Sequence, residues 1–265
     1  MQGCICPHPP LLIPEVGGAG RAKVTDTIAA MERLAESIGE PDTVVVISPH
    51  ADGFGDAHAV KTSPRLCGDF GRFRCPDVSF AYENDVQFAE LLLAFAGDYR
   101  QLSLTPDEGD VLDWGVLVPL SFLKPQKIVA LSVVGPYAEH RTLGKLVRRC
   151  AEELGRDTLF LASGDLSHAL THDAPAPYDP RGKLFDDELL SLLGIGDFAG
   201  LTRIEPVLLE GAAECGLRSF VALGGFLGDD ALVDPQILSY EGPYGVGYLV
   251  ARFGAPASHA RGEAG

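Results

Sequence analysis

Residues 43–50 read TVVVISPH, and this stretch decides the fold. Its first five residues are all β-branched. Apolar and polar residues do not alternate along this run. A strand of this kind is buried on both faces, as the central strands of parallel sheets are. The run ends at Ser48-Pro49-His50, because proline cannot donate a hydrogen bond to a neighbouring strand. We therefore predict an α/β protein in which His50 follows the carboxyl end of a central strand.

Further strand and helix patterns alternate along the chain. Predicted strands cover 2–6, 101–105, 127–134, 158–162, 236–240 and 246–252. Predicted helices cover 22–38, 84–96, 115–123, 138–154, 181–193, 197–202 and 205–226, the last broken near Cys215-Gly216. Segment 52–80, rich in Gly, Pro and Asp, is expected to hold short strands and loops. The alternation predicts one α/β domain over residues 1–253, with a central, largely parallel mixed sheet flanked by helices, and a flexible tail over 254–265.

The composition excludes several classes of partner. The chain has 265 residues, 46% of them hydrophobic, which is enough for a sizeable core. Its net charge of −16 argues against binding to nucleic acid or to an anionic membrane surface. No apolar run approaches the roughly 18–20 residues that a membrane span needs, and no basic leader opens the sequence. The six cysteines are scattered without a CxxC, which predicts reduced thiols and a cytoplasmic location.

Four titratable side chains follow predicted strands: His8, His50, His168 and Glu241. Ligands of parallel α/β sheets bind beyond the carboxyl ends of the strands, so these residues are candidates for a common site. Two imidazoles and one carboxylate hold Fe(II) in non-haem oxygenases and leave positions open for substrate and O₂. The wide spacing does not force this geometry, as HExxH would. Each residue could instead serve a turn or a backbone hydrogen bond.

Two cysteine-containing groupings offer other interpretations. Cys4, Cys6 and His8 alternate along one strand and could share a face, but they lack the turn and the fourth ligand of a structural zinc site. Two core cysteines beside a strand-end histidine are the simpler interpretation. Cys215 could be a nucleophile at a helix start, although a buried and inert thiol is the more frequent case.

The segment around His168 allows two further kinds of chemistry. Ser163 or Ser167 with His168 would suit a hydrolase, yet the GxSxG elbow is absent. Asp165 and His168 could act as an acid/base pair without a metal. No GxGxxG or Walker pattern follows a predicted strand, so a nucleotide is not expected.

Four stretches in this order resemble a known family: residues 7–15 (PHPPLLIPE), 47–50 (ISPH), 162–168 (ASGDLSH) and 239–248 (SYEGPYGVGY). They resemble the class III extradiol dioxygenase superfamily of LigB type. Within it they are most similar to the bacterial branch called AmmeMemoRadiSam system protein B, which is related to Memo proteins. The resemblance covers roughly residues 4–253 and implies the LigB-like α/β fold.

The resemblance also implies a function and a site. His8, His50 and Glu241 match the residues that ligate Fe(II), with Zn or Mn as alternative ions, and His168 matches the acid/base histidine. Ring-cleaving members chelate a small aromatic diol on the iron and add O₂ beside it. A histidine at the acid/base position could take a proton from the diol near neutral pH. The residues expected to line a substrate pocket are Pro9, Asp113, Trp114, Asp165, Arg218 and Tyr244.

One residue departs from the pattern of the ring-cleaving relatives. They often carry Asp-His-Gly where this chain reads Asp113-Trp114-Gly115, so an apolar indole replaces a histidine that could bind substrate or O₂. Two functions follow. The first is an Fe(II)-dependent extradiol-type dioxygenase that cleaves a catecholic ring. The second is a Memo-like metal-binding scaffold or redox module without ring cleavage, with a radical-SAM protein, an AMMECR-type protein or a second copy of the chain as partner.

Overall fold

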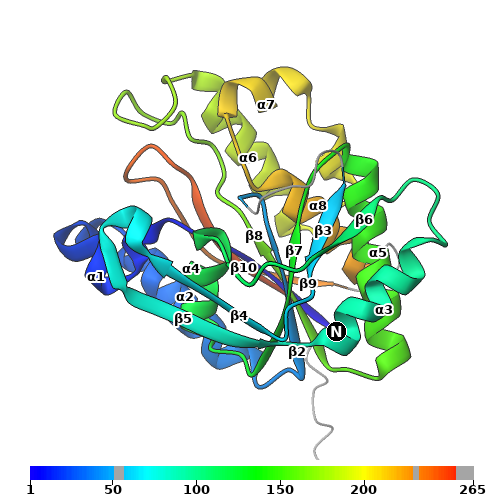
Figure 1. Ribbon diagram of the computed structural model, residues 1–265. Helices are drawn as coiled ribbons and strands as arrows, with labels where there is room; N and C mark the ends of the chain where they lie inside the picture. The colour runs from blue at the N-terminus through cyan, green and yellow to red at the C-terminus, as the bar shows by residue number, and fades with distance from the viewer. Residues whose placement is uncertain (51–56, 229–232, 255–265) are drawn as a thin grey trace, which may run out of the picture.

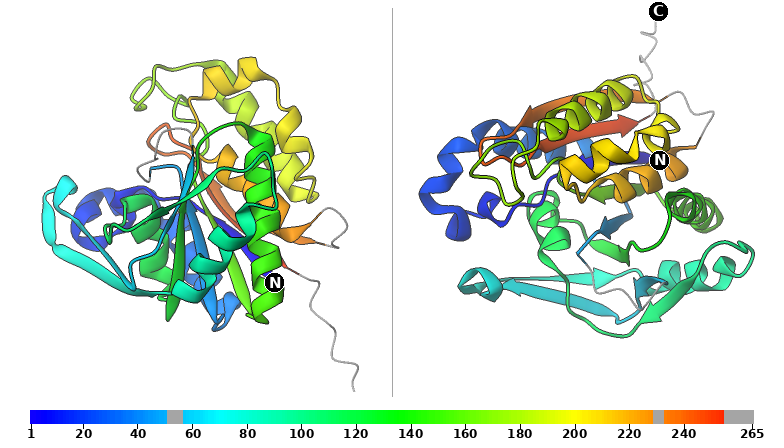
Figure 2. Two further views of the ribbon diagram at one scale, coloured as in Figure 1. Left: turned by 45° about the vertical axis from the view of Figure 1, so that its right-hand side comes forward. Right: turned by 90° about the horizontal axis from the view of Figure 1, so that it is seen from above.

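The computed structural model describes residues 1–50, 57–228 and 233–254. In that part of the chain a ten-stranded sheet lies between two layers of helices (Figures 1 and 2). The strands are β1 (Gln2–Cys6), β2 (Thr43–Ser48), β3 (His58–Lys61), β4 (Arg65–Phe70), β5 (Cys75–Asn84), β6 (Leu104–Asp107), β7 (Lys127–Ser132), β8 (Thr158–Ser163), β9 (Asp234–Glu241) and β10 (Tyr248–Gly254). The α-helices are α1 (Pro14–Gly17), α2 (Thr25–Ile38), α3 (Val86–Ala96), α4 (Trp114–Leu123), α5 (Tyr137–Leu154), α6 (Pro180–Gly194), α7 (Pro206–Ala212) and α8 (Leu217–Leu227).

The strands follow the order β4-β5-β7-β2-β8-β1-β10-β9, with β3 paired to β7 and β6. The five strands from β5 to β1 in this order are mutually parallel. On one side of these five strands, β10 pairs antiparallel with β1, and β9 pairs antiparallel with β10. On the other side, β4 pairs antiparallel with β5. The predicted single α/β fold with a mixed, largely parallel sheet is therefore confirmed.

Strand β2 lies in the middle of the sheet, and all of its residues are buried. Val45 and Ile47 pack in a core cluster that includes apolar residues of α3, α5 and α8. Val44 and Val46 belong to a second cluster that includes residues of α2 and α4. Because successive side chains of a strand point to opposite faces, a strand between two helical layers must be apolar throughout. This is the physical reason for the TVVVI run.

Two of the predicted elements that differ from the observed ones are short. The strand predicted at 101–105 begins only at Leu104, because Leu102 closes a hydrogen-bonded turn onto Tyr99. The helix predicted at 197–202 is a single 3₁₀ turn, Gly200–Arg203. There the Asp197 carboxylate accepts a hydrogen bond from the Gly200 backbone N–H, which forms a side-chain turn in place of helix.

The segment predicted as short strands and loops contains β3 and the β4–β5 hairpin. The tip of this hairpin is a 3₁₀ turn, Gly71–Phe73, and the hairpin extends toward α1 (Figure 1). Residues 52–56 of that segment lie outside the described residues. The tail was predicted to start at residue 254, which is one residue too early because Gly254 still belongs to β10, and residues 255–265 are not described.

The carboxyl ends of β1, β8 and β2 lie side by side, since β8 pairs in parallel with both of the other strands. The segments that leave these ends are Pro7-His8, Gly164-Asp165 and Pro49-His50. Parallel pairing thus brings together side chains that are more than 150 residues apart in sequence.

None of the helices in the described part of the chain has the length and apolarity that a bilayer crossing requires.

Candidate metal centre

His8 and His50 face each other beyond the ends of β1 and β2. Their Nε2 atoms are 2.9 Å apart, and the two rings meet edge to face. The Cys215 thiol completes the group, with its Sγ 3.6 Å from His8 Nε2. The donor atoms of all three residues lie within 4.8 Å of one another. Two imidazoles and one sulfur at this separation are a donor set that a transition-metal ion can bind.

Cys215 reaches the group from the break between α7 and α8. Gly164, directly after β8, packs against Gly216 so closely that a Cβ added at Gly164 would lie 2.2 Å from the Gly216 Cα. The Asp165 backbone N–H donates to Cys215 Sγ, and the Gly216 N–H donates to the Asp165 carbonyl. Two glycines therefore allow the backbones to approach, and this approach places the thiol beside His8.

A buried serine fixes the protonation of His8. Ser163 Oγ lies 2.5 Å from the Gly115 carbonyl oxygen and 2.9 Å from His8 Nδ1. A carbonyl can only accept, so the serine hydroxyl donates to Gly115, and its oxygen then accepts from Nδ1–H of His8. The other ring nitrogen, Nε2, carries a lone pair and points at His50 and Cys215. A hydrogen bond of this kind orients ligand histidines in metal sites.

The start of α4 supports His50. The Asp113 carboxylate caps this helix by accepting from the Gly115 N–H, and it also accepts from Ser48 Oγ. The same Ser48 oxygen accepts from the His50 backbone N–H. The helix start therefore touches both histidines, through Ser48 on one side and through Ser163 on the other.

The protein keeps both imidazoles neutral. Burial, and next the nearby His168, lower the pKa of His8 to about 3. Burial, and next His8, lower the pKa of His50 to about 4. Burial acts in the opposite sense on Cys215 and raises the pKa of its thiol well above the usual range. Neutral imidazoles are ready to bind a metal, whereas the thiol must release its proton as the metal binds.

Asp165 and His168 form a second group around the same thiol. Their side-chain donor atoms and Cys215 Sγ also lie within 4.8 Å of one another. Asp165 accepts a hydrogen bond from the His8 backbone N–H at 3.0 Å, and burial raises the pKa of its carboxyl to about 6. In the described part of the structure His168 Nδ1 is buried and has no hydrogen-bond partner. This arrangement places a carboxyl and an imidazole next to the metal donors.

The Glu241 carboxylate has partners outside this group of donors. This residue ends β9, and its Oε1 accepts hydrogen bonds from the backbone N–H of Thr27, at 2.8 Å, and from the Thr27 hydroxyl. The carboxylate thus binds the first turn of α2, where the positive end of a helix stabilises negative charge. Among the described residues, neither group of metal donors includes Glu241. The structure brings Cys215, and not Glu241, to the two histidines.

The residues expected in a substrate pocket have separate places. Trp114 stacks on His50 with ring centroids 4.3 Å apart, and the Arg72 guanidinium covers the indole at 4.9 Å. The indole therefore packs on His50 and supports this metal-ligand candidate. Pro9 is buried at the start of a 3₁₀ turn. Arg218 lies over the Tyr137 ring on the surface.

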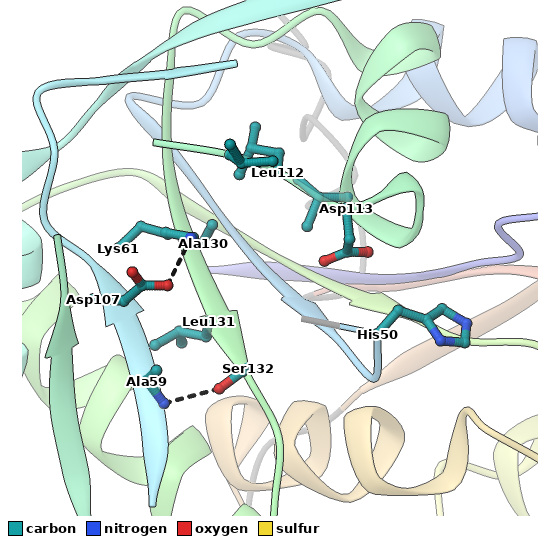
Figure 3. Close-up of a pocket in the computed structure, with 11 residues that line it drawn as sticks. His50, Ala59, Lys61, Asp107, Leu112, Asp113, Ala130, Leu131 and Ser132 are labelled. Carbon is teal, nitrogen blue, oxygen red and sulfur yellow. Dashed lines mark hydrogen bonds and ion pairs between the residues drawn. The ribbon is translucent and has the colours of Figure 1, made fainter. Parts of the chain in front are cut away.

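Tyr244 and Asp113 complete that set. The Tyr244 hydroxyl donates to the Gly20 carbonyl, and Lys23 lies over its ring, so this tyrosine anchors the segment between α1 and α2. Asp113 is the one member of the set that lines a pocket beside His50 (Figure 3).

Cys215 was missing from the set of predicted ligands. The break in the helix pattern at Cys215-Gly216, which would place a thiol at a helix end, was the only sequence signal for it.

The comparisons with known proteins agree with this fold. Residues 2–251 match the family model described as the catalytic LigB subunit of aromatic ring-opening dioxygenase. A crystal structure of the uncharacterized protein JW3007 from Escherichia coli K12 superposes with a TM-score of 0.64. It is 18% identical and covers 96% of this chain and 100% of that one. This likeness shows a shared fold.

Two curated relatives indicate the branch of the family to which the chain is most similar. Protein CA_C1420 from Clostridium acetobutylicum is 35% identical over 270 residues, which are 95% of this chain and 57% of that protein. The chain thus spans little more than half of that relative's length. The MEMO1 family protein MK0963 from Methanopyrus kandleri is 27% identical over 217 residues, which are 74% of this chain and 70% of that protein. On the match over residues 2–251 and these relatives, the chain belongs to the LigB family, in its Memo-type branch.

Proposed function

We propose that this chain is a metal-dependent oxidoreductase of dioxygenase type, in which His8, His50 and Cys215 hold the metal ion. The observation that supports it is the meeting of these three donors within 4.8 Å at the carboxyl edge of the sheet of a LigB-family protein. Open α/β sheets bind their ligands at this edge. We further propose that the substrate is a small aromatic diol and that O₂ is the co-substrate, as the ring-opening relatives suggest.

The donor set fits a transition metal. Burial favours the neutral form of both imidazoles, and their Nε2 atoms lie 2.9 Å apart, with the Cys215 Sγ 3.6 Å from that of His8. Imidazole suits Fe, Zn and Cu, and a thiolate favours softer ions than a carboxylate does. We propose Fe(II) as the working ion, with Zn or Mn as ions that could occupy the site on purification. Bound Fe(II) would supply the redox chemistry that O₂ requires and a positive charge to hold a substrate hydroxyl.

The protein's own residues would move the protons. His168 is placed to accept a proton from a substrate hydroxyl, and Asp165 lies beside it to stabilise the imidazolium that results. Asp165 also holds the His8 backbone, so it couples the proton acceptor to a metal ligand. Trp114 and Arg72 cover the outer side of His50 and limit the access of water there.

A second candidate function is a Memo-like metal-binding module without ring cleavage. Two observations favour it: a thiol occupies the place predicted for the Glu241 carboxylate, and Trp114 stands where ring-cleaving relatives often carry a histidine. Under this proposal the partners would be a radical-SAM protein and an AMMECR-type protein, or a second copy of the chain. The two functions share the metal site and differ in whether O₂ is consumed.

The test begins with the full chain, purified without oxygen and reconstituted with Fe(II). Oxygen consumption and ring-fission absorbance are then recorded over a panel of catechols. We expect O₂ uptake in the wild type, loss of iron binding in Cys215→Ser, and retained iron in Glu241→Gln. His168→Ala should keep the iron and lose turnover.

Each contrary result has a distinct meaning. Iron binding without O₂ uptake would support the Memo-like module, and Trp114→His would then be the next variant. Iron that is lost in Glu241→Gln but kept in Cys215→Ser would overturn the ligand assignment. Failure of the wild type to bind any transition metal would overturn both functions.

A further inference from the structure

A second pair of histidines lies outside the candidate metal centre, where the start of β3 meets the first turn of α5. His58 is the first residue of β3, and His140 lies in the first turn of α5. Both residues are completely buried, and their rings meet edge to face with centroids 5.1 Å apart. The neighbouring Glu139 carboxylate has one oxygen 3.9 Å from His58 Nε2. Two imidazoles and one carboxylate therefore meet between a strand and a helix.

The ring nitrogens of this pair lack the partners that buried polar atoms normally have. Nε2 of His58 and Nε2 of His140 are both buried, and neither has a hydrogen-bond partner in the part of the chain that the structure describes. At least about nine in ten buried polar groups in folded proteins are paired, so each exception needs a reason. Two exceptions on adjoining rings point to one ligand that binds both nitrogens.

The separation of the two rings fits a shared metal ion. Zinc lies about 2.0–2.1 Å from an imidazole nitrogen, so two imidazoles on one tetrahedral ion have centroids roughly 5 Å apart. The 5.1 Å between the centroids of His58 and His140 agrees with this separation. Two donors on such an ion lie at most about 4.2 Å apart, and the 3.9 Å from His58 Nε2 to Glu139 is within this limit.

The candidate metal centre has a histidine pair of the same geometry. The rings of His8 and His50 have centroids 4.7 Å apart and an interplanar angle of 76°, against 5.1 Å and 82° for His58 and His140. The second pair thus repeats, at a different place in the fold, the arrangement from which a metal site was inferred at the first.

The surroundings favour the neutral form of these imidazoles, which is the form that binds a metal. Burial, then His58 and then Arg218 lower the pKa of His140 to about 3, although the Pro136 carbonyl acts in the opposite sense. Burial also lowers the pKa of His58. Near neutral pH, protons would therefore not compete with a metal ion for the two nitrogens. Glu139 adds the negative charge that a cation requires.

The carboxylate must turn inward to complete such a site. All donor atoms of the candidate metal centre lie within 4.8 Å of one another, and the donors of His58, His140 and Glu139 do not all meet that separation. Glutamate has much rotamer freedom, and 22% of the Glu139 side chain is exposed, so it can move without opening the core. The two buried histidines form the fixed part of the site.

We propose that His58, His140 and Glu139 form a second metal site, which takes Zn²⁺. Imidazole and carboxylate are both zinc ligands, and a site with three protein ligands leaves the fourth position to water. A bound ion would tie the start of β3 to the start of α5. The site shares no residue with the candidate metal centre, so it does not depend on the proposed function.

Counting the zinc ions bound by the full chain tests this proposal. The metal-free protein is titrated with Zn²⁺ in competition with a chromophoric chelator, and the bound metal is measured after desalting. We expect two equivalents in the wild type, one in Cys215→Ser and one in His140→Gln. Glu139→Gln should weaken one equivalent by at least about tenfold. The matched control is His172→Gln, which changes an exposed histidine stacked on Tyr178 and should still bind two equivalents.

Cobalt distinguishes the two sites by their ligands. A thiolate gives bound Co²⁺ a strong near-ultraviolet charge-transfer band, which imidazole and carboxylate ligands do not produce. In Cys215→Ser this band should be absent, while the visible absorption of one bound Co²⁺ remains. Combining Cys215→Ser with Glu139→Gln should then weaken the remaining Co²⁺. If His140→Gln fails to fold, these two variants carry the test, because Glu139 is partly exposed.

The contrary outcomes are distinct. A single equivalent of zinc in the wild type that is lost in Cys215→Ser would overturn the proposal. So would two equivalents in folded His140→Gln, unchanged affinities in Glu139→Gln, or the loss of one equivalent in His172→Gln. The first centre fails separately: a single equivalent that survives Cys215→Ser and is lost in His140→Gln would support the second site and overturn the ligand assignment of the first.

Discussion

Replacing Ser163 with alanine tests whether a buried hydroxyl sets up the metal centre. The serine is fully buried, and its oxygen joins His8 Nδ1 to the Gly115 carbonyl. Ser163→Ala leaves both of these groups without their partner. A buried polar group left unpaired costs about 1–3 kcal/mol, and two groups lose their partner here, so we expect the free energy of unfolding to fall by roughly 2–6 kcal/mol.

The same change should weaken metal binding through His8. Without the hydroxyl, the proton of His8 is free to move to Nε2, the atom that faces the other donors. Loss of such an orienting hydrogen bond typically costs about 10–100-fold in metal affinity. The assay is Zn²⁺ binding in competition with a chromophoric chelator, alongside thermal unfolding of the metal-free protein.

A second buried serine provides the matched control. Ser219 in α8 is also fully buried, and in the described structure its hydroxyl has no hydrogen-bond partner. Ser219→Ala should therefore change neither Zn²⁺ affinity nor, by more than about 0.5 kcal/mol, stability. If Ser163→Ala lowers stability but leaves Zn²⁺ affinity within threefold of the wild type, the hydroxyl is only a packing group and the reasoning is refuted.

Three further predictions concern other parts of the structure. Gly164→Ala should lower the melting temperature and the Zn²⁺ affinity together, because its Cβ would lie 2.2 Å from the Gly216 Cα; a wild-type melting curve would contradict this. Burial raises the pKa of Asp186 to about 6, although the Tyr240 hydroxyl donates to its carboxylate and acts in the opposite sense, so the folded state binds more protons than the unfolded state, whose aspartate pKa is about 3.9. Stability should therefore fall by about 2 kcal/mol from pH 4 to pH 6, and urea unfolding of Asp186→Asn should show a decrease smaller by that amount. Lys124 ends α4 in the left-handed conformation with φ +46°, so Lys124→Gly should raise stability by up to about 1 kcal/mol, and a lower melting temperature would refute this.

Most of the fold could be predicted from the sequence because local patterns of apolar residues and of glycine indicate its strands and helices. The unbroken apolar run of β2 requires a helical layer on each face of the sheet, and the structure has both layers. Helix α2 ends at Gly39, as the glycine after the periodic residues indicates. The elements predicted at 101–105 and 197–202 differ from the observed ones because hydrogen-bonded turns form at Tyr99 and Asp197. A hydrophobic pattern of only about five residues is too weak to predict such turns.

The strand pattern by itself predicted that His8, His50 and His168 share one edge of the sheet. Each of them follows a buried strand, and parallel neighbours place such ends together. Only the tertiary structure decided which residue joins the two histidines. The approach of Gly164 to Gly216 brings in Cys215, while Glu241 is held by Thr27 at the start of α2. Contacts between segments distant in sequence depend on how side chains pack, and no local pattern encodes that packing.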